Sequence, residues 1–389
     1  MNRKLQNSKR SGWTDSAPMG MGTPPFTGEA RPRAWSSARE TIAWGLATFC
    51  LFVLVGPSTN VAEASMTHQG SLLITTDTVW ETDWSINGDL IVSGGATLTL
   101  RGAFTHSISG SLQVNSGATL EASGQGYPAE AGPTPGASGV TGGGGGHGGL
   151  GGLAGTHLIP ADFSDSSLLP TQGGSGGGNG SFSPGGTGGG VIHFQVSGAC
   201  LLDGHLNANG EDAASSVAGG VGGGGAGGTI RLSCDVLSGD GTLAANGGDG
   251  GHDLSGGCCT GNLGNGGGGG GGRIVMRAHD HAAFTGKTNS TVNGGAPGIG
   301  VGPQGEPGGR GTLAFITLSS ESNPLTQFTT QSDTHLDLYQ GWRWEAVAGA
   351  PFVYTEVRAH ENTQIMGGRE DVALQASHLS LHNTTWDGS

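Results

Sequence analysis

Two histidines near residue 280 have the spacing of metal ligands. In His279-Asp280-His281 the imidazoles are two positions apart, and on a β-strand such positions share a face. Imidazoles are common zinc ligands, but a zinc site needs three or four donors. The sequence assigns no third donor. We therefore expect the polar end of a strand here, and we predict no metal and no cofactor.

A second candidate is a calcium loop at residues 246–254 (Asn-Gly-Gly-Asp-Gly-Gly-His-Asp-Leu). This stretch resembles the calcium-binding nonapeptide G-G-x-G-x-D-x-U-x. Counted from Gly247, however, His252 occupies the position of the required aspartate, and Asp253 comes one place late. Such sites are built from tandem copies, and the sequence holds a single one. We predict no calcium site in this stretch.

Arrangements typical of catalysis are also missing from the sequence. The only lysine after residue 64 is Lys287, which lacks the upstream glycine spacing of a phosphate loop. Glycoside hydrolysis needs two carboxylates on either side of one bond. The adjacent acidic pairs, Glu211-Asp212 and Glu370-Asp371, do not meet that need, because neighbours on a strand point to opposite faces. We expect no catalytic residues and no enzymatic activity.

Four cysteines follow residue 64, and an even number in an exported chain suggests disulfides. Three connectivities remain open, and the spacing contains no C-x-x-C zinc pattern. A bond between the two adjacent cysteines would be strained, so we expect each of them to pair elsewhere. The disulfide candidates are Cys200, Cys234, Cys258 and Cys259.

Internal repeats indicate which elements position these residues. Residues 88–98 and 110–120 share the pattern G-x-L-x-V-x-x-G-A-T-L at an offset of 22. Apolar residues at every second position are typical of a half-buried strand. A repeat of this length with two short strands suits one coil of a parallel β-solenoid, which must stack on its neighbour to bury its apolar edge. We therefore predict that Leu90 lies over Leu112 and Val92 over Val114.

A longer motif, in which a strand follows a glycine-rich run, recurs in residues 126–318. Its four copies lie at 189–194, 227–232, 271–276 and, more loosely, 310–315. We predict that the apolar anchors of the first three copies occupy equivalent buried positions in one sheet. In the first three copies a second strand and then an Asn-Gly step follow, and such a step supplies the positive φ of a tight turn. The anchors are Ile192, Ile230, Ile274 and Leu313, and the steps are Asn209-Gly210, Asn246-Gly247 and Asn293-Gly294.

Glycine supplies 82 of the 389 residues, and charged residues are only 12%. Without side chains, glycine backbones can approach closely. We therefore expect the runs at 142–146, 222–225 and 266–272 to lie side by side as extended threefold helices of the polyglycine-II type, hydrogen-bonded to one another. The alternative is that they are flexible loops on a β-core.

Residues 1–64 have the features of an export leader. Basic residues precede an apolar run at 42–56, Pro57 ends the run, and Ala62-Glu63-Ala64 offers a cleavage site. The run is shorter than the ~20 residues that span a bilayer. A membrane anchor is the alternative. Cleavage would remove seven of the 16 basic and four of the 30 acidic residues, and leave a formal charge of −17 that disfavours nucleic acids and anionic lipids.

The remaining 71 residues, 319–389, regain tryptophan and charge, and 351–359 and 372–386 are predicted strands. The chain stops in the middle of a pattern, which suggests a fragment of a longer protein. We thus expect a leader (1–64), β-helix-like coils (65–125), a glycine-rich repeat region (126–318) and a C-terminal β region (319–389). The fold class is all-β, a parallel β-solenoid with glycine-rich loops.

The strand after a glycine-rich run and the later Asn-Gly step together resemble the glycine-rich repeats of large secreted and cell-surface proteins. Bacterial surface proteins and plant glycine-rich wall-associated proteins share this texture, and so do the extracellular part of anaplastic lymphoma kinase-like receptors and some phage tail-tip adhesins. The resemblance covers residues 188–318. It implies an extracellular β-scaffold and supplies no catalytic residues.

Together these features predict a secreted or cell-surface structural or adhesive scaffold that is not an enzyme. Its expected partners are polysaccharides, other matrix or surface proteins, or further copies of itself. The alternative is a polysaccharide lyase or hydrolase on a right-handed β-helix. Three or more acidic or basic side chains grouped in a groove along a strand face would favour the enzyme.

Overall fold

The computed structural model describes residues 65–155, 159–256 and 264–318, together with the backbone of six strands after residue 318. Residues 61–389 form the larger of two units of the chain. The predicted leader, Cys258 and Cys259 lie outside the described residues. The architecture below is that of the larger unit.

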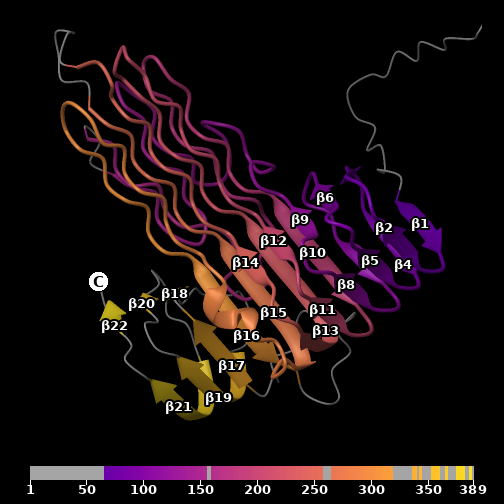
Figure 1. Ribbon diagram of the computed structural model, residues 1–389. Coiled ribbons are helices and arrows are strands. Elements are labelled where there is room, and N and C mark those ends of the chain that lie inside the picture. Colours follow the sequence, from indigo (N-terminus) through magenta and orange to yellow (C-terminus); the bar gives the residue numbers. More distant parts are fainter. Residues whose placement is uncertain are drawn as a thin grey trace, which may run out of the picture. The chain divides into compact units, whose positions relative to one another are not determined.

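The described chain is nearly all parallel β-structure, as the all-β prediction requires, and its one helical turn in these residues is η1 (Gly286–Asn289) (Figure 1). Short strands follow one another in groups of three, separated by corners of a few residues. The strands of the first three groups are β1 (Met66–Gln69), β2 (Leu72–Ile74), β3 (Thr78–Trp80), β4 (Trp84–Asn87), β5 (Leu90–Val92), β6 (Thr97–Leu100), β7 (His106–Ile108), β8 (Leu112–Val114) and β9 (Thr119–Glu121).

The later groups contain glycine-rich insertions between their strands. These strands are β10 (Val191–Val196), β11 (Cys200–Leu202), β12 (His205–Asn207), β13 (Thr229–Ser238), β14 (Thr242–Ala244), β15 (Arg273–Asp280) and β16 (Thr312–Thr317). Each strand pairs in parallel with the corresponding strand of the next group. One ladder runs β1-β4-β7-β10-β13-β15-β16, a second runs β2-β5-β8-β11-β13, and a third runs β3-β6-β9-β12-β14.

The predicted registers are confirmed. Leu90 pairs with Leu112 and Val92 with Val114 across β5 and β8. In the first ladder Ile192 pairs with Ile230, Ile230 with Ile274, and Ile274 with Leu313. All of these side chains are fully buried in one continuous apolar core. The stacking extends one group further towards the N-terminus than the sequence indicated, because Leu72 of β2 pairs with Leu90, although the two residues are 18 and not 22 positions apart.

An aromatic cluster fills the core at the level of the first strand groups. The indole rings of Trp80 and Trp84 stack with their centroids 4.7 Å apart, and His106 and Phe194 lie against Trp80. His106 Nδ1 accepts the backbone N–H of Trp84 at 3.2 Å. Burial lowers the pKa of His106 to about 4, although Asp83 opposes that shift, so the ring is neutral at pH 7.

Positive φ angles occur at the corners of the 22-residue pattern and not at the Asn-Gly steps. Gly94 and Gly95 have φ of 69° and 76°, and Gly117 has φ of 79°. These glycines supply the turn that precedes each A-T-L strand, where a side chain would be strained. The predicted Asn-Gly turns are wrong, because Gly210, Gly247 and Gly294 do not have positive φ. The asparagines have another role, described below.

The glycine runs are ordered and packed side by side, as predicted. Along 266–272, successive N–H groups donate to three different neighbours in turn. Residues 266, 269 and 272 bond to carbonyls 251, 248 and 245; residues 267 and 270 bond to 142 and 145; residues 268 and 271 bond to 306 and 309. A hydrogen-bond period of three is the symmetry of an extended threefold helix.

The runs 142–149, 221–228 and 266–272 form the centre of this packing. Gly145 N–H donates to Gly224 O, Gly224 N–H to Gly267 O, and Gly267 N–H to Gly142 O, so the three runs bond in a closed cycle. We call these runs and the segments bonded to them the glycine lattice. A Cβ at Gly144, Gly224 or Gly269 would overlap the carbonyl of a neighbouring run, which explains why this packing requires glycine.

After β16 the direction of pairing changes once. Strand β17 (His335–Tyr339) is antiparallel to β16, and β19 (Phe352–Ala359) and β21 (Leu374–Leu381) then extend the sheet in parallel. The strands β18 (Gly341–Arg343), β20 (Gln364–Met366) and β22 (Thr385–Asp387) form a separate three-stranded sheet. The strands predicted at 351–359 and 372–386 correspond to β19 and to β21 with β22.

Candidate functional site

A regular array of side chains runs along one edge of the glycine lattice. It contains every third residue of three neighbouring segments, three from each. We call it the polar array, although its last two members are apolar. Its rows are Asn209, Asp212 and Ser215; Asn246, Asp249 and His252; and Asn293, Ala296 and Ile299.

Each side chain of one row accepts a backbone N–H of the next row. Between the first two rows, Asn209 Oδ1, Asp212 Oδ1 and Ser215 Oγ accept the N–H groups of residues 246, 249 and 252 at 2.8, 2.7 and 3.2 Å. Between the second and third rows, Asn246 Oδ1, Asp249 Oδ1 and His252 Nδ1 accept those of residues 293, 296 and 299 at 2.8, 2.6 and 2.9 Å. The predicted turn asparagines thus join adjacent segments.

These bonds fix the array as a regular, partly exposed surface. Asp212 and Asp249 are exposed, and Asn209, Asn246 and His252 are half-buried. Adjacent hydrogen-bonded segments are about 4.8 Å apart. Three residues of an extended threefold helix span about 9 Å, which is close to the length of two sugar residues in an extended polysaccharide. The array offers carboxylate and amide oxygens, which accept hydrogen bonds from hydroxyl groups.

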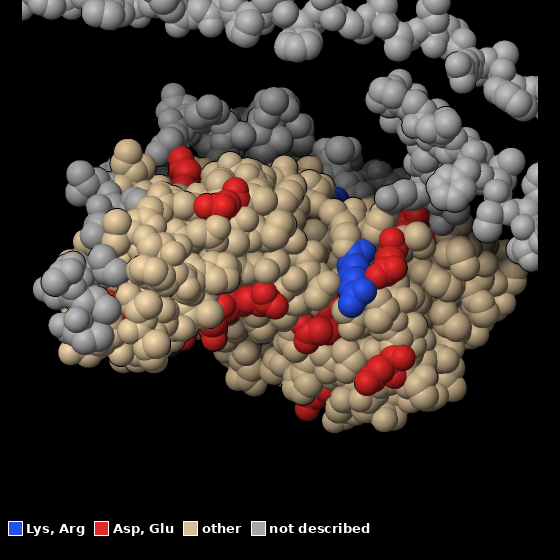
Figure 2. All heavy atoms as spheres, turned by 90° about the horizontal axis from the view of Figure 1, so that it is seen from above, with Lys and Arg blue, Asp and Glu red and all other residues tan. Residues whose placement is uncertain are grey.

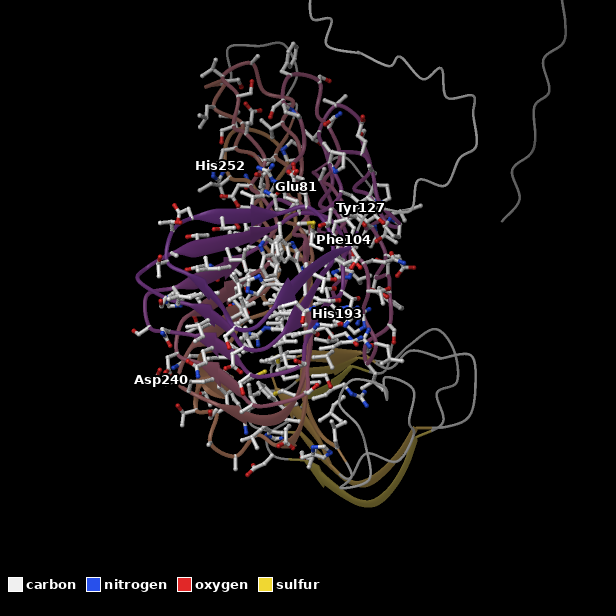
Figure 3. The ribbon with its side chains drawn as sticks, turned by 90° about the vertical axis from the view of Figure 1, so that its right-hand side faces the viewer. Glu81, Phe104, Tyr127, His193, Asp240 and His252 are labelled. Atoms are coloured by element: carbon white, nitrogen blue, oxygen red, sulfur yellow. The ribbon has the colours of Figure 1, made fainter. Side chains whose placement is uncertain are left out.

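Figure 2 shows acidic side chains scattered over a mostly uncharged face, with few basic groups. In Figure 3, His252 lies among the glycine-rich loops and Asp240 lies at the other end, near the strands. The two residues of the acidic pair Glu211-Asp212 make different contacts. The Asp212 side chain belongs to the array, and the backbone carbonyl of Glu211 accepts the Gly225 N–H. Glu370 and Asp371 lie outside the described residues.

The calcium-like stretch forms the second row of the array. Asp249 and His252 accept the backbone bonds described above, whereas Asp253 is only 2% exposed and accepts the N–H of Ser255 at 2.9 Å. Within the described ranges, no three His, Cys, Asp or Glu side chains are grouped as metal ligands would be. The side chains of this stretch therefore bind neighbouring backbone.

The two histidines at 279 and 281 interact with different strands. His279 Nδ1 lies 3.0 Å from Asp235 Oδ1, on the β13 side of β15. His281 Nε2 lies 3.1 Å from Thr317 Oγ1, on the β16 side, and Lys287 Nζ approaches its Nδ1 at 2.8 Å. The structure does not bring the two imidazoles together on one ligand.

Three arginines gather on the outward face of the first ladder, which sequence reasoning missed. Arg231 of β13 and Arg273 and Arg277 of β15 alternate with the core residues Ile230 and Ile274. The period of two along the strand was the signal that could have placed them on one face. Three basic side chains are thus grouped on one strand face. They are at most 4% exposed, however, and do not line the accessible groove that would favour an enzyme.

A covering segment, residues 164–172, accounts for the burial of two of these arginines. Arg273 Nη2 donates to the carbonyls of Ser164 and Asp165 at 2.8 and 3.0 Å, and its Nε donates to Ser164 O at 3.1 Å. Arg231 Nη1 donates to Pro170 O at 3.3 Å. A guanidinium has five donors in a fixed plane and suits several carbonyls at once. These two arginines fasten the segment to the sheet.

The pKa values of ionisable groups near this segment are shifted by burial and by neighbouring groups. Burial, and then the charge of Arg277, lowers the pKa of Arg231 to about 10, although Asp165 opposes this. Burial would raise the pKa of Asp165, but nearby His147 and backbone N–H groups hold it at about 2. Burial lowers the pKa of His193 to about 3, and the charges of Arg231 and His106 add to that effect. Asp165 is therefore charged and His193 neutral at pH 7.

A pocket of about 200 Å³ lies where the loop after β6 meets the first glycine-rich segment. Its wall includes Gln125, Tyr127 and Val191, with glycine backbone between them. Figure 3 labels Tyr127, which lines this pocket. The only ionisable group that lines the pocket is the Tyr127 phenol, so the pocket has no acid–base pair for catalysis.

Two of the predicted disulfide cysteines lie together in the core. Cys200 and Cys234 are buried and carry free thiols. Burial, and then a hydrogen bond with the Cys234 thiol, raises the pKa of Cys200. Thiolate is the reactive form, so a raised pKa lowers the reactivity of the Cys200 thiol in the folded protein. The prediction that Cys258 and Cys259 form disulfides, though not with each other, concerns residues outside the described part and stays a prediction.

In the parts of the chain that the structure describes, no helix is long and apolar enough to cross a membrane. Comparison with protein-family models, curated proteins and solved structures gives no match to this chain.

Proposed function

We propose that this protein is a non-catalytic scaffold outside the cell or on its surface, and that its polar array contacts extended polysaccharides. In this proposal the strand groups are coils of a parallel β-solenoid, and the glycine lattice is a polyglycine-II insertion between them. The observation that carries it is the set of six side-chain-to-backbone bonds that hold the array in a regular grid.

The charge distribution supports a binding role rather than a chemical one. The exposed acidic groups of the array are spaced along a flat edge, whereas catalysis requires acid, base or metal groups that converge on one pocket. Two of the buried arginines, Arg231 and Arg273, are held by backbone carbonyls of the covering segment. A lyase would need such arginines in contact with its substrate.

Binding and cleavage assays on the full chain test this proposal. The chain is incubated with insoluble plant and bacterial polysaccharides, and both retention and release of oligosaccharides are measured. Ala296→Arg places a bulky charge in the array at a residue whose side chain accepts no bond there. Ala283→Arg is the matched control, because Ala283 is exposed and lies outside the array.

We expect at least one polysaccharide to retain the chain, and we expect Ala296→Arg to reduce retention several-fold while Ala283→Arg does not. Retention by no polymer would contradict the contact role. Release of oligosaccharides that a single carboxylate substitution abolishes would identify an enzyme instead.

A further inference from the structure

The glycine-rich hairpins end at the part of the lattice away from the strands (Figure 1). These ends carry exposed apolar side chains. We call the six residues the apolar crown. Their exposed fractions are 44% for Val140, 62% for Phe182, 74% for Val217, 57% for Leu254, 64% for Ile299 and 36% for Val301.

Backbone hydrogen bonds join these hairpin ends to one another, so the crown is one patch. The bonds run from Ser181 N–H to Val140 O (3.2 Å), from Phe182 N–H to Gly220 O (2.9 Å), from Leu254 N–H to Ser216 O (2.9 Å) and from Val301 N–H to Asp253 O (3.3 Å). Residues 216 and 220 belong to the same turn as Val217. The patch is therefore held by the same kind of bonding as the lattice beneath it.

The crown is almost free of charge. Segments 138–141, 179–184, 215–221, 252–256 and 299–304 contain no lysine, arginine or glutamate. Their one acidic residue, Asp253, is 2% exposed. Six large apolar side chains, each about half exposed, present on the order of 500 Å², a size at which a patch marks an interaction site.

A second copy of the chain is a poor occupant for this patch. A stable protein interface buries about 800 Å² on each partner, more than the crown provides. Two copies would also bring together chains with a formal net charge of −14 each, and like charges repel.

A lipid surface requires no matching shape and accepts apolar side chains to a depth of about 5–10 Å. Backbone groups near lipid must be hydrogen-bonded, and those of Phe182, Leu254 and Val301 donate to neighbouring turns. The acidic net charge disfavours anionic lipids. We infer that the apolar crown binds neutral, zwitterionic lipid bilayers, a role different from that of the polar array, with which the crown shares Ile299.

Flotation of the full chain with phosphatidylcholine vesicles tests this inference. The crown buries an apolar area comparable to a single acyl chain, so we expect half-saturation near ~0.1 mM lipid. Vesicles that contain phosphatidylserine should bind less. Phe182→Trp should show a blue-shifted fluorescence on addition of vesicles, which reports entry of this position into the bilayer.

The double variant Phe182→Asp/Val217→Asp should weaken vesicle binding at least tenfold. Its matched control is Leu73→Asp/Val79→Asp, which changes two equally apolar, exposed residues (59% and 49%) outside the crown and should bind like the unaltered chain. Thermal unfolding confirms that all variants fold. Absence of binding, equal loss in both double variants, or a crown-dependent dimer formed without lipid would overturn the inference.

Discussion

The side chain of Asn246 accepts the backbone N–H of Asn293 at 2.8 Å. The bond joins two segments that are 47 residues apart in the chain. A bond of the same kind and length joins the two preceding rows, where Asn209 Oδ1 accepts the Asn246 N–H. The asparagine side chains of the first two Asn-Gly steps are therefore structural links between rows of the polar array.

Removal of this acceptor should destabilise the lattice. Asn246→Ala leaves the Asn293 N–H without its partner, and we expect a loss of about 1–3 kcal/mol in the free energy of unfolding. Asn246→Asp keeps the Oδ1 acceptor and should retain most of that energy. Urea unfolding measures the difference. The same change at exposed Asn293, in the outermost row, should cost less than about 0.5 kcal/mol, and an equal cost at both sites would contradict the link.

Two adjacent glycines in one run should respond oppositely to a methyl group. At Gly144 a Cβ would overlap the carbonyl of Gly268, so Gly144→Ala should destabilise the protein by about 1–3 kcal/mol or more. At Gly143 the nearest atom to a Cβ is the Ala137 nitrogen at 3.5 Å, an ordinary contact. Gly143→Ala should be neutral or stabilise by up to about 1 kcal/mol, because it restricts the unfolded chain. Thermal melts distinguish the pair, and similar melts for both variants would refute close packing of this run.

Two buried histidines should make the fold sensitive to mild acid. The folded-state pKa of His106 is about 4 and that of His193 is about 3, both below the ordinary value of 6.5. Between these values and pH 6.5 the unfolded chain binds more protons than the folded chain, so stability falls as the pH is lowered through this window. Each histidine contributes a slope of about 1.4 kcal/mol per pH unit.

Urea unfolding between about pH 7 and pH 5 checks this dependence. His193→Gln should reduce the slope of unfolding free energy against pH by about 1.4 kcal/mol per pH unit, the contribution of one proton. His205→Gln alters an exposed ring and serves as the control. An unchanged slope in His193→Gln would show that this histidine does not control the acid response.

The covering segment should depend on a buried arginine. Arg273→Met removes the donors that bind the carbonyls of Ser164 and Asp165, and we expect a loss of about 3–5 kcal/mol. Arg101→Met removes an arginine that is 52% exposed and bonded to Glu81 at 2.8 Å, and it should cost less than about 1 kcal/mol. Hydrogen exchange of residues 164–172 should accelerate in the first variant alone. Unchanged exchange there would mean that other contacts hold the segment.

The sequence alone determined the registers of the repeated strands. The same neighbours surround each member of two residue sets, Leu90 with Leu112 and Ile192 with Ile230 and Ile274. Apolar residues at every second position also indicate which side of a strand faces the core. Stacking equivalent residues is the way to bury all of these edges at once, so a local pattern was sufficient. The same reasoning anticipated that the glycine runs pack together, because only glycine permits backbones to approach so closely.

Tertiary structure alone decided what the polar residues do. An Asn-Gly step suits a tight turn, but Asn209 and Asn246 lie beside a backbone N–H supplied by a segment 37 or 47 residues later, and the side-chain bond to that segment replaced the turn. Arg231 and Arg273 became buried because a distant segment supplies carbonyls over their strands. The polar array and the apolar crown likewise join residues from several hairpins. Their proximity depends on which runs are neighbours in the lattice, and glycine runs of nearly identical sequence carry no information about that choice.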